Sequence, residues 1–448
     1  MIRNLSDVVR QFKQEWTNQL EDAAIGEVCR AEGMTWRQTI LTPIVTIKVF
    51  CLQILHGNTA CDGMQHLARL AFTGAAYCEA RIRIPLAVFQ RLLTLTAARM
   101  QEAISACGLW RGHRLFHVDG SSFSMPDTAV LQQEFGQPTG QKPGCGFPVA
   151  HFLSLMHAGT GMVMKVLTAP MRTHDISGMV DLHPELREND VLVGDRGFCS
   201  YAHLALLLRR GVQAVFRIHQ QQIVDFAEGR PYAVPGRGSK RSKKGLPRSR
   251  WIKKLGSQDQ LVEYFKPLEC PKWMTAEQFA SLPATLTLRE LRYRIECKGF
   301  RSEEITLVTT FLDANDYPAK ELESQYLRRW NIETNFRHLK ITMKMDVLKC
   351  QTVDGVLKEL AVFVLIYNLV RLVMLEAAKR QEVEVDRISF IDALRWLVSA
   401  RPGDELCELV VNPHRPERYE PRVRKRRPKV NSLMTRPRAE LKKALAAK

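Results

Sequence analysis

Between residues 114 and 219 the hydrophobic pattern alternates between strand and helix, and this alternation constrains the fold more than any other feature of the chain. A strand-like run at RLFHVD precedes two apolar runs joined by AGTG, which is typical of a hairpin. A helix, the short apolar strand VLVG, an amphipathic helix that stops at Gly211 and a last strand follow. This order predicts an α/β fold built on a mixed sheet.

The segments on either side of this alternation have a different texture. Apolar residues recur at helical spacing before it, and after it strand-like runs follow a loop rich in Gly, Pro, Ser and basic residues. We therefore divide the chain into a helical N-terminal segment and candidate DNA-binding domain (1–108), the first part of the α/β core (109–219), a β-rich insertion with a basic loop (220–312), the second part of the core (313–350), C-terminal helices (351–411) and a basic tail expected to be disordered (412–448).

Positive charge is concentrated in two segments of a chain whose formal net charge is +18. Residues 229–258 contain ten lysines and arginines and no acidic residue, and residues 415–448 contain thirteen against three glutamates. Because the rest of the chain is close to neutral, the basicity belongs to these two segments. Nucleic acid is the partner that such segments favour, and solubilising tails are the alternative.

Several other functional classes are disfavoured. The 11 cysteines include no CxxC pair, which argues against a zinc knuckle or a disulfide framework and favours reduced thiols in the cytoplasm. No apolar signal core is present near Met1, and the most apolar run, Ala361–Leu375, is too short to span a bilayer, so we expect a buried helix and no membrane partner. The chain has no P-loop or dinucleotide fingerprint, so no nucleotide cofactor is expected.

Two aspartates follow strand-like runs. Asp119 precedes Gly-Ser-Ser, which reads as a turn, and Asp195 precedes Arg-Gly-Phe. Open α/β sheets place their ligands at this rim, although a single aspartate there is commonly a turn former or a helix cap. The serines after Asp119 lack a G-x-S-x-G context, which disfavours a serine nucleophile; they are Ser121, Ser122 and Ser124.

A third carboxylate lies on a helix predicted from Pro318 to about Lys344. At about 100° per residue, this helix carries a polar stripe about 60° wide. The stripe consists of Tyr326, Arg329, Glu333 and Lys340, with Trp330 and Arg337 beside it. Such a mixture is not typical of a core face and suits a helix that helps to hold a metal ion and grips phosphates. Three carboxylates without His or Cys partners favour Mg²⁺ or Mn²⁺, and two such ions about 4 Å apart can drive phosphoryl transfer.

On these residues the chain resembles bacterial insertion-sequence transposases that have an RNase H-like core and an Asp-Asp-Glu triad. It is most similar to the insertion-sequence-four branch, whose signature Tyr-x2-Arg-x3-Glu-x6-Lys is present in full from Tyr326 to Lys340. The Asp119-Gly and Asp195-Arg-Gly-Phe segments match the branch's first and second aspartate regions. The resemblance covers roughly residues 110–380, and the long separation of Asp195 from Glu333 matches the branch's β insertion.

The resemblance implies a fold, a reaction and a set of partners. An RNase H-like mixed sheet would carry Asp119, Asp195 and Glu333 as ligands of two Mg²⁺ or Mn²⁺ ions, while Tyr326, Arg329 and Lys340 would position phosphates. The implied reaction is cut-and-paste transposition, with cleavage at the element ends, a hairpin intermediate and strand transfer. The implied partners are double-stranded DNA, as terminal inverted repeats and target, and a second copy in a synaptic homodimer. Such a protein would work in the bacterial cytoplasm at the nucleoid.

Three further expectations concern the insertion and competing interpretations. Hairpin formation needs a base turned out of the stack, and we take Trp251 in the basic loop as the aromatic that holds it, with core burial as the alternative for this residue and for Trp273. Asp175, which follows His174, is expected to cap a helix, although an acid–base pair is the alternative. For the whole chain, the alternatives to a transposase are an inactive, transposase-derived DNA-binding protein and a metal-dependent nuclease without strand transfer.

Overall fold

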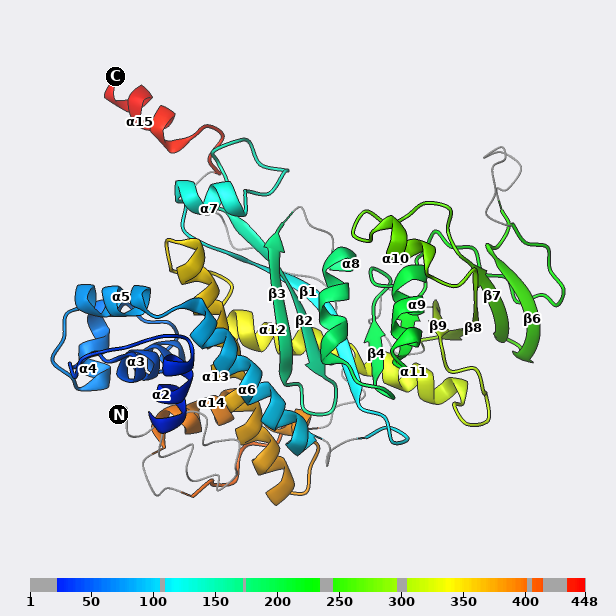
Figure 1. Ribbon diagram of the computed structural model, residues 1–448, viewed down its shortest axis with the longest axis horizontal. Helices are drawn as coiled ribbons and strands as arrows, with labels where there is room; N and C mark the ends of the chain where they lie inside the picture. Colours follow the sequence, from blue (N-terminus) through cyan, green and yellow to red (C-terminus); the bar gives the residue numbers. More distant parts are fainter. Residues whose placement is uncertain are drawn as a thin grey trace.

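The computed structural model describes residues 22–104, 109–171, 175–233, 245–295, 304–400, 405–413 and 433–447. Their strands form one nine-stranded sheet in the order β3-β2-β1-β4-β5-β9-β8-β7-β6, which crosses the molecule in Figure 1. The strands are β1 (Leu115–Ser124), β2 (Val149–His157), β3 (Val163–Pro170), β4 (Val191–Gly194), β5 (Gln213–Arg217), β6 (Ser249–Gly256), β7 (Asp259–Phe265), β8 (Thr285–Arg294) and β9 (Glu304–Thr309).

The first five strands form the predicted mixed sheet. β1 pairs antiparallel with β2 and parallel with β4, β4 pairs parallel with β5, and β2 and β3 form the predicted hairpin. The connections are α7 (Ala129–Glu134), α8 (Asp175–Gly178), η3 (Met179–Glu185) and α9 (Tyr201–Arg209). This is an RNase H-like core, so the predicted fold class is confirmed, and the short helix α7 is an addition that the hydrophobic pattern did not indicate.

The β-rich insertion extends the same sheet. β6, β7, β8 and β9 pair antiparallel in sequence order, and β9 then pairs antiparallel with β5. One short helix, α10 (Ala276–Ala280), accompanies them. Pairing with β9 covers what would otherwise be an exposed edge of the core. The four strands predicted in the insertion are present, and the structure adds that they are continuous with the core sheet.

Helices from both ends of the chain pack together beside the sheet. Thr42 caps the N-terminus of α3 and accepts a hydrogen bond from the Val45 backbone N–H, with Pro43 in the first turn. Two of the N-terminal helices, which are blue in Figure 1, contact α13 (Val353–Arg380); they are α3 and α6. The remaining helices are α2 (Asp22–Ala31), α3 (Pro43–Leu55), η2 (Cys61–Gly63), α4 (Met64–Ala68), α5 (Gly74–Arg83), α6 (Leu86–Ile104), η5 (Val385–Arg387), α14 (Phe390–Ser399) and α15 (Arg438–Ala446).

The apolar helix α13 is the central element of this layer. By length and composition it could cross a membrane, but 94% of its apolar window is buried inside the protein, in agreement with the predicted buried helix. Its Asn368 side chain binds both backbone groups of Val163 at the start of β3, which satisfies a polar group inside an apolar helix. Side chains of the N-terminal helices, α13 and the sheet belong to one hydrophobic cluster. Residues on both sides of the predicted domain boundary at residue 108 share this cluster, so the boundary stays a prediction.

Two predicted elements differ from the structure. Asp119 does not end a strand, because β1 continues through the predicted Gly-Ser turn to Ser124 and pairs with β2 from Phe116 onward. The backbone groups beyond Asp119 are thus satisfied by β2 after the ladder with β4 has stopped at Val118 and Gly194. This extension places Ser121 and Ser122 in a strand.

The predicted continuous helix from Pro318 to Lys344 is divided into three pieces. They are α11 (Ala319–Arg328), α12 (Asn331–Arg337) and the π-helical turn η4 (His338–Thr342). Between α11 and α12 the backbone switches to i→i−3 hydrogen bonds, as in Ile332 N–H to Arg329 C=O at 3.0 Å. The side chains of the predicted stripe therefore do not follow one ideal helical face.

Candidate functional site

The parallel pairing of β1 and β4 brings the two aspartates together. The last pair of that ladder is Val118 with Gly194, so the next residues, Asp119 and Asp195, lie side by side on neighbouring strands. Gly194 is required here by space, because a Cβ atom at this position would lie 2.9 Å from the Phe216 ring. The sheet register therefore assembles this half of the site.

Asp119 is a partly buried carboxylate with a strongly perturbed acidity. Its Oδ2 accepts a hydrogen bond from Arg329 Nη1 at 3.1 Å, and its Oδ1 accepts one from the Gly120 backbone N–H at 2.9 Å. Burial raises the pKa of Asp119 to about 6, the Arg329 charge opposes this, and the negative charges of Asp195 and Glu333 add to the rise. Since both other carboxylates contribute to this pKa, the structure brings the three predicted acidic residues into one electrostatic neighbourhood.

The three carboxylates are not close enough together to enclose a metal ion. Among the residues that the structure describes, no three His, Cys, Asp or Glu side chains converge closely enough to enclose a metal ion. Asp119 and Asp195 form a pair on the sheet, while Glu333 is exposed on the first turn of α12. The donor set still fits a hard divalent cation, because it consists of carboxylate oxygens whose mutual repulsion is already expressed in the pKa of Asp119.

Two residues of the helix signature bind the aspartates directly. Tyr326, which is 1% exposed, donates its hydroxyl to Asp195 Oδ1 at 3.2 Å. Arg329, which is 3% exposed, pairs with Asp119, and its guanidinium lies over the rings of Tyr326 and Trp330 at 5.6 and 5.3 Å. Burial raises the pKa of Tyr326 to about 12, so the phenol remains a hydrogen-bond donor at neutral pH. These contacts face the carboxylates rather than a surface groove.

The remaining signature residues lie farther along the same segment. Lys340 donates from its Nζ atom to Ser121 Oγ at 3.1 Å, and burial lowers the pKa of this half-buried ammonium. Arg337 is exposed on the last turn of α12. The spacing of the signature thus corresponds to contacts with the sheet. Its Tyr, Arg and Lys contact Asp195, Asp119 and Ser121, in that order. Among the described residues, Glu333 makes no such contact and is open to a ligand.

The aromatic residues predicted in the insertion lie elsewhere. Trp251 is on β6, the far edge strand of the sheet, five strands from β4, or roughly 24 Å at the usual strand spacing. The structure therefore does not bring Trp251 together with the aspartates. Trp273 stacks on His203 with ring centroids 4.4 Å apart and packs against the main core, which supports core burial for this residue. His174 lies outside the described residues, and α8 begins at Asp175.

Sequence reasoning missed two residues at the site. Arg217 ends β5 in the row that continues from Asp119 and Asp195, because Gly194 pairs with Phe216, and its charge lowers the pKa of Tyr326. Its only sequence signal is a basic residue at the end of an apolar run. Ser121 carries no sequence signal as a partner of Lys340, because the Gly-Ser segment has the composition of a turn and their contact depends on the extension of β1.

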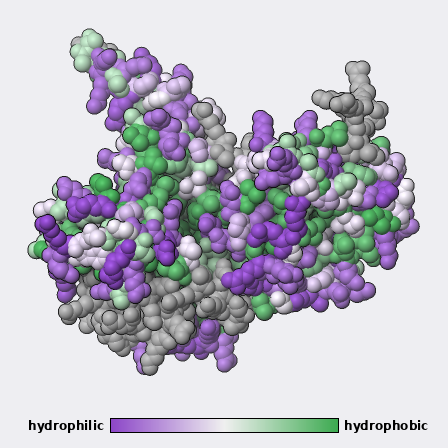
Figure 2. All heavy atoms as spheres, in the orientation of Figure 1, coloured by the Kyte–Doolittle hydropathy of each residue, from purple (hydrophilic) through white to green (hydrophobic). Residues whose placement is uncertain are grey.

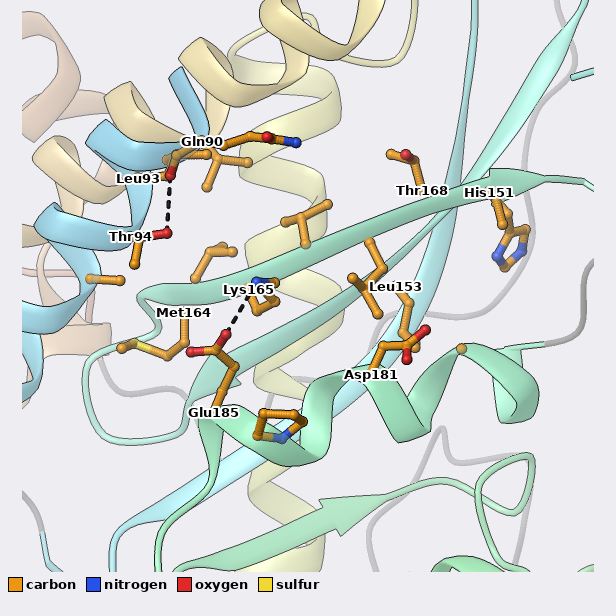
Figure 3. A pocket seen from close by; sticks show the side chains of 18 of the residues that line it. Gln90, Leu93, Thr94, His151, Leu153, Met164, Lys165, Thr168, Asp181 and Glu185 are labelled. Atoms are coloured by element: carbon orange, nitrogen blue, oxygen red, sulfur yellow. Dashed lines mark hydrogen bonds and ion pairs between the residues drawn. The ribbon is translucent and has the colours of Figure 1, made fainter. Parts of the chain in front are cut away.

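A groove on the described surface lies away from these carboxylates. It has a volume of about 950 Å³ and follows the outer edge of β3 between α6 and η3, as the close view in Figure 3 shows. Lys165 and Glu185 form an ion pair of 3.1 Å in it, and Figure 2 shows apolar side chains in the corresponding hollow. None of the site residues predicted from the sequence lines this groove. The candidate functional site is therefore the carboxylate cluster and not the groove.

Comparison with known proteins identifies the family. Residues 110–369 match the family described as "Transposase DDE domain". Transposase InsG for insertion sequence element IS4 of Escherichia coli (strain K12) is 25% identical over 374 residues, which are 79% of this chain and 77% of InsG. The putative transposase InsZ of the same organism is 29% identical over 150 residues, 33% of this chain and 48% of InsZ.

A solved structure of piggyBac transposase in a synaptic complex with hairpin DNA is also similar. It shares 11% sequence identity and covers 86% of this chain and 78% of its own, but its TM-score of 0.43 is too low to support an inference. The family match instead spans the sheet from before β1 to the middle of α13, including all residues of the carboxylate site. The chain therefore belongs to the transposase DDE domain family, whose members are DNA-cleaving transposases.

Proposed function

We propose that this protein moves its own insertion sequence by cut-and-paste transposition with two Mg²⁺ or Mn²⁺ ions. The observation that supports this most is the row formed by Asp119 and Asp195 on adjacent strands, with the charge of Glu333 close enough to raise the pKa of Asp119. Asp119, Asp195 and Glu333 would hold the ions. When bound, the ions would activate the attacking oxygen and stabilise charge on the leaving oxygen of a DNA phosphate.

The contacts of the helix signature support a division of roles. Tyr326 and Arg329 are buried against Asp195 and Asp119, so we assign them to positioning these carboxylates rather than to the phosphate contact predicted from the sequence. Arg337, which is exposed, and Lys340, which is half-buried, are better placed to contact the DNA backbone. Trp330 supports Arg329 through its ring.

Closure of the metal site would require Glu333 to approach the two aspartates. Its position on the first turn of α12, directly after the i→i−3 hydrogen bonds that separate α11 from α12, supports this proposal. Because the Glu333 side chain is exposed, a change in its conformation would bring the carboxylate closer without moving the buried Arg329 and Tyr326. Binding of cations between the carboxylates would supply the driving force, because it relieves their mutual repulsion.

The proposal extends to partners and to the course of the reaction. Terminal inverted repeats and target DNA would be bound as duplexes by a synaptic homodimer, in the bacterial cytoplasm at the nucleoid. A hairpin at the cleaved end would need an aromatic that holds a displaced base. Trp251 stays a prediction for this role, and its position on the edge strand β6 supports contact with DNA outside the carboxylate site.

The decisive experiment uses a supercoiled plasmid carrying the DNA ends that flank the reading frame, with Mg²⁺. Wild type should release the element and join it to target DNA, and Asp119→Ala, Asp195→Ala and Glu333→Ala should each abolish both steps. Thr334→Ala, at the exposed neighbour of Glu333, is the matched control and should remain active. Excision by any of the three acidic variants would refute the triad. Cleavage without joining would identify a nuclease, and binding without cleavage would identify an inactive DNA-binding descendant.

A further inference from the structure

The extension of β1 beyond Asp119 gives the site a second polar position. Ser121 lies two residues after Asp119, on the same face of the strand and about 7 Å along it. Its Oγ atom accepts a hydrogen bond from Lys340 Nζ at 3.1 Å. The direction of this bond is fixed by chemistry, because an ammonium group can only donate.

This direction leaves the proton of the Ser121 hydroxyl available. Within the described part of the chain, the hydroxyl donates to no acceptor, and the half-buried residue remains open to solvent. Lys340 forms no ion pair with any described residue, and its ammonium is half-buried as well. A hydroxyl donor and an ammonium group therefore lie next to each other on the strand that carries Asp119. The negative charge of Asp346 acts on Lys340 from a distance, but no ion pair joins the two side chains among the described residues.

The position of Lys340 over Ser121 is held by packing on both sides. Phe152 is the direct cross-strand partner of Ser121 and packs edge-to-face on Phe336 of α12, with ring centroids 5.2 Å apart. Leu339, next to Lys340, is buried in the main core. The π-helical turn η4 carries Lys340, and such turns add a residue that redirects the side chains around them. The pair is thus preorganised rather than a chance surface contact.

We propose that Ser121 and Lys340 form one binding site for a DNA phosphate, next to the phosphate that is cleaved at Asp119 and Asp195. The ligand is a phosphodiester oxygen, which accepts the Ser121 O–H and is attracted by the Lys340 charge. Ser121 acts both as a direct contact and as the group that orients the ammonium. This inference rests on the proposed transposase function and adds Ser121 as a DNA-binding residue.

The test compares two nearly isosteric replacements on the same strand position. Thr and Val are both β-branched and nearly equal in size, so Ser121→Thr retains the hydroxyl while Ser121→Val carries a methyl group in its place. Ser122→Ala is the matched control, because Ser122 is adjacent but lies on the opposite face of β1. Each protein is titrated with a duplex that represents the cleaved element end, in EDTA, and binding is followed by fluorescence anisotropy.

Ser121→Val should bind this duplex about tenfold more weakly than Ser121→Thr, since a hydrogen bond to a charged group is lost. A series of duplexes in which single phosphates near the end are replaced by neutral methylphosphonates locates the contact. One replacement should weaken binding to wild type and Ser121→Thr clearly more than binding to Ser121→Val, which retains only the attraction of the Lys340 charge. Lys340→Met combined with Ser121→Val should cost no more than Lys340→Met alone, because the two residues hold one oxygen.

Equal affinity of Ser121→Thr and Ser121→Val, or additive losses at every methylphosphonate position, would overturn the pair. This readout needs neither metal nor cleavage. If wild type cuts and joins DNA while Ser121→Thr and Ser121→Val bind the duplex alike, only the proposed Ser121–Lys340 phosphate site is refuted. If wild type neither cuts nor joins, the transposase proposal fails, whatever the binding series shows.

Discussion

Replacing Arg329 by Gln tests how the site is held together. The change removes the guanidinium that pairs with Asp119 at 3.1 Å and leaves the carboxylate without a cation. Arg329 is almost fully buried, whereas the Asp119 side chain is 24% exposed. Loss of one partner of a fully buried pair costs about 3–5 kcal/mol, and the partial exposure of Asp119 together with its pKa of about 6 limits the loss to about 1–2 kcal/mol at neutral pH.

The pH dependence of this loss follows from the acidity of Asp119. In the folded protein the pKa of Asp119 is about 6, against 3.8 for an unperturbed aspartate, so its ionisation already opposes folding as the pH rises between these values. Arg329 lowers this pKa, and its removal raises it further. The difference in unfolding free energy between wild type and Arg329→Gln should therefore be small in acid and grow as the pH rises through about 6.

Metal binding should report the same change independently of stability. Metal ligands must be deprotonated, so each unit by which the pKa of Asp119 exceeds the pH lowers apparent metal affinity about tenfold. Mn²⁺ titration by calorimetry should show weaker binding to Arg329→Gln near neutral pH and recovery at higher pH. Arg328→Gln removes the same charge from the exposed preceding residue and is the control. Indistinguishable unfolding and Mn²⁺ affinity of the two variants at every pH would refute the positioning role of Arg329.

Three further outcomes follow from other contacts. Tyr326→Phe should lower the free energy of unfolding by about 1 kcal/mol and weaken Mn²⁺ binding less than Arg329→Gln does, since it removes one hydrogen bond to Asp195; equal effects in calorimetry would contradict this. Gly194→Ala should cost about 1–3 kcal/mol in urea unfolding, because its Cβ would overlap the Phe216 ring, and an unchanged midpoint would show that the ring can yield. Burial lowers the pKa of His183 to about 3 from 6.5, so stability is lost as the pH falls from about 6.5 towards 3. His183→Phe should flatten this acid limb, and an unchanged limb would assign the loss to other groups.

Much of the candidate site was accessible from the sequence because its carboxylates and basic residues lie at recognisable places. Asp195 directly follows the apolar strand β4, and a strand of this kind is readable from composition alone. The spacing from Tyr326 to Lys340 was likewise readable, although the ideal helix used to interpret it is interrupted. The direction in which the Tyr326 and Arg329 side chains point could not be predicted from the sequence, because it depends on burial against the sheet.

Long-range pairing decided the features that local patterns could not show. The Gly-Ser segment after Asp119 has the composition of a turn, and only its pairing with β2 makes it a strand. In the same way, the insertion reads as separate strands, and only the contact of β9 with β5 joins it to the core sheet. Local propensity was overruled in both cases by hydrogen bonds to residues distant in sequence.

The sequence by itself determined most of the order of elements, the identity of the three carboxylates and the helix signature, and, through the family resemblance, the RNase H-like class. Hydrophobic periodicity and motif spacing are local patterns, so they can be read from neighbouring residues without knowing how distant segments pack. The tertiary structure alone decided which carboxylate each signature residue contacts, that Glu333 stands apart from the aspartate pair, and that Ser121 meets Lys340. These relations depend on strand register and on the break between α11 and α12, and they join segments that are far apart in the sequence.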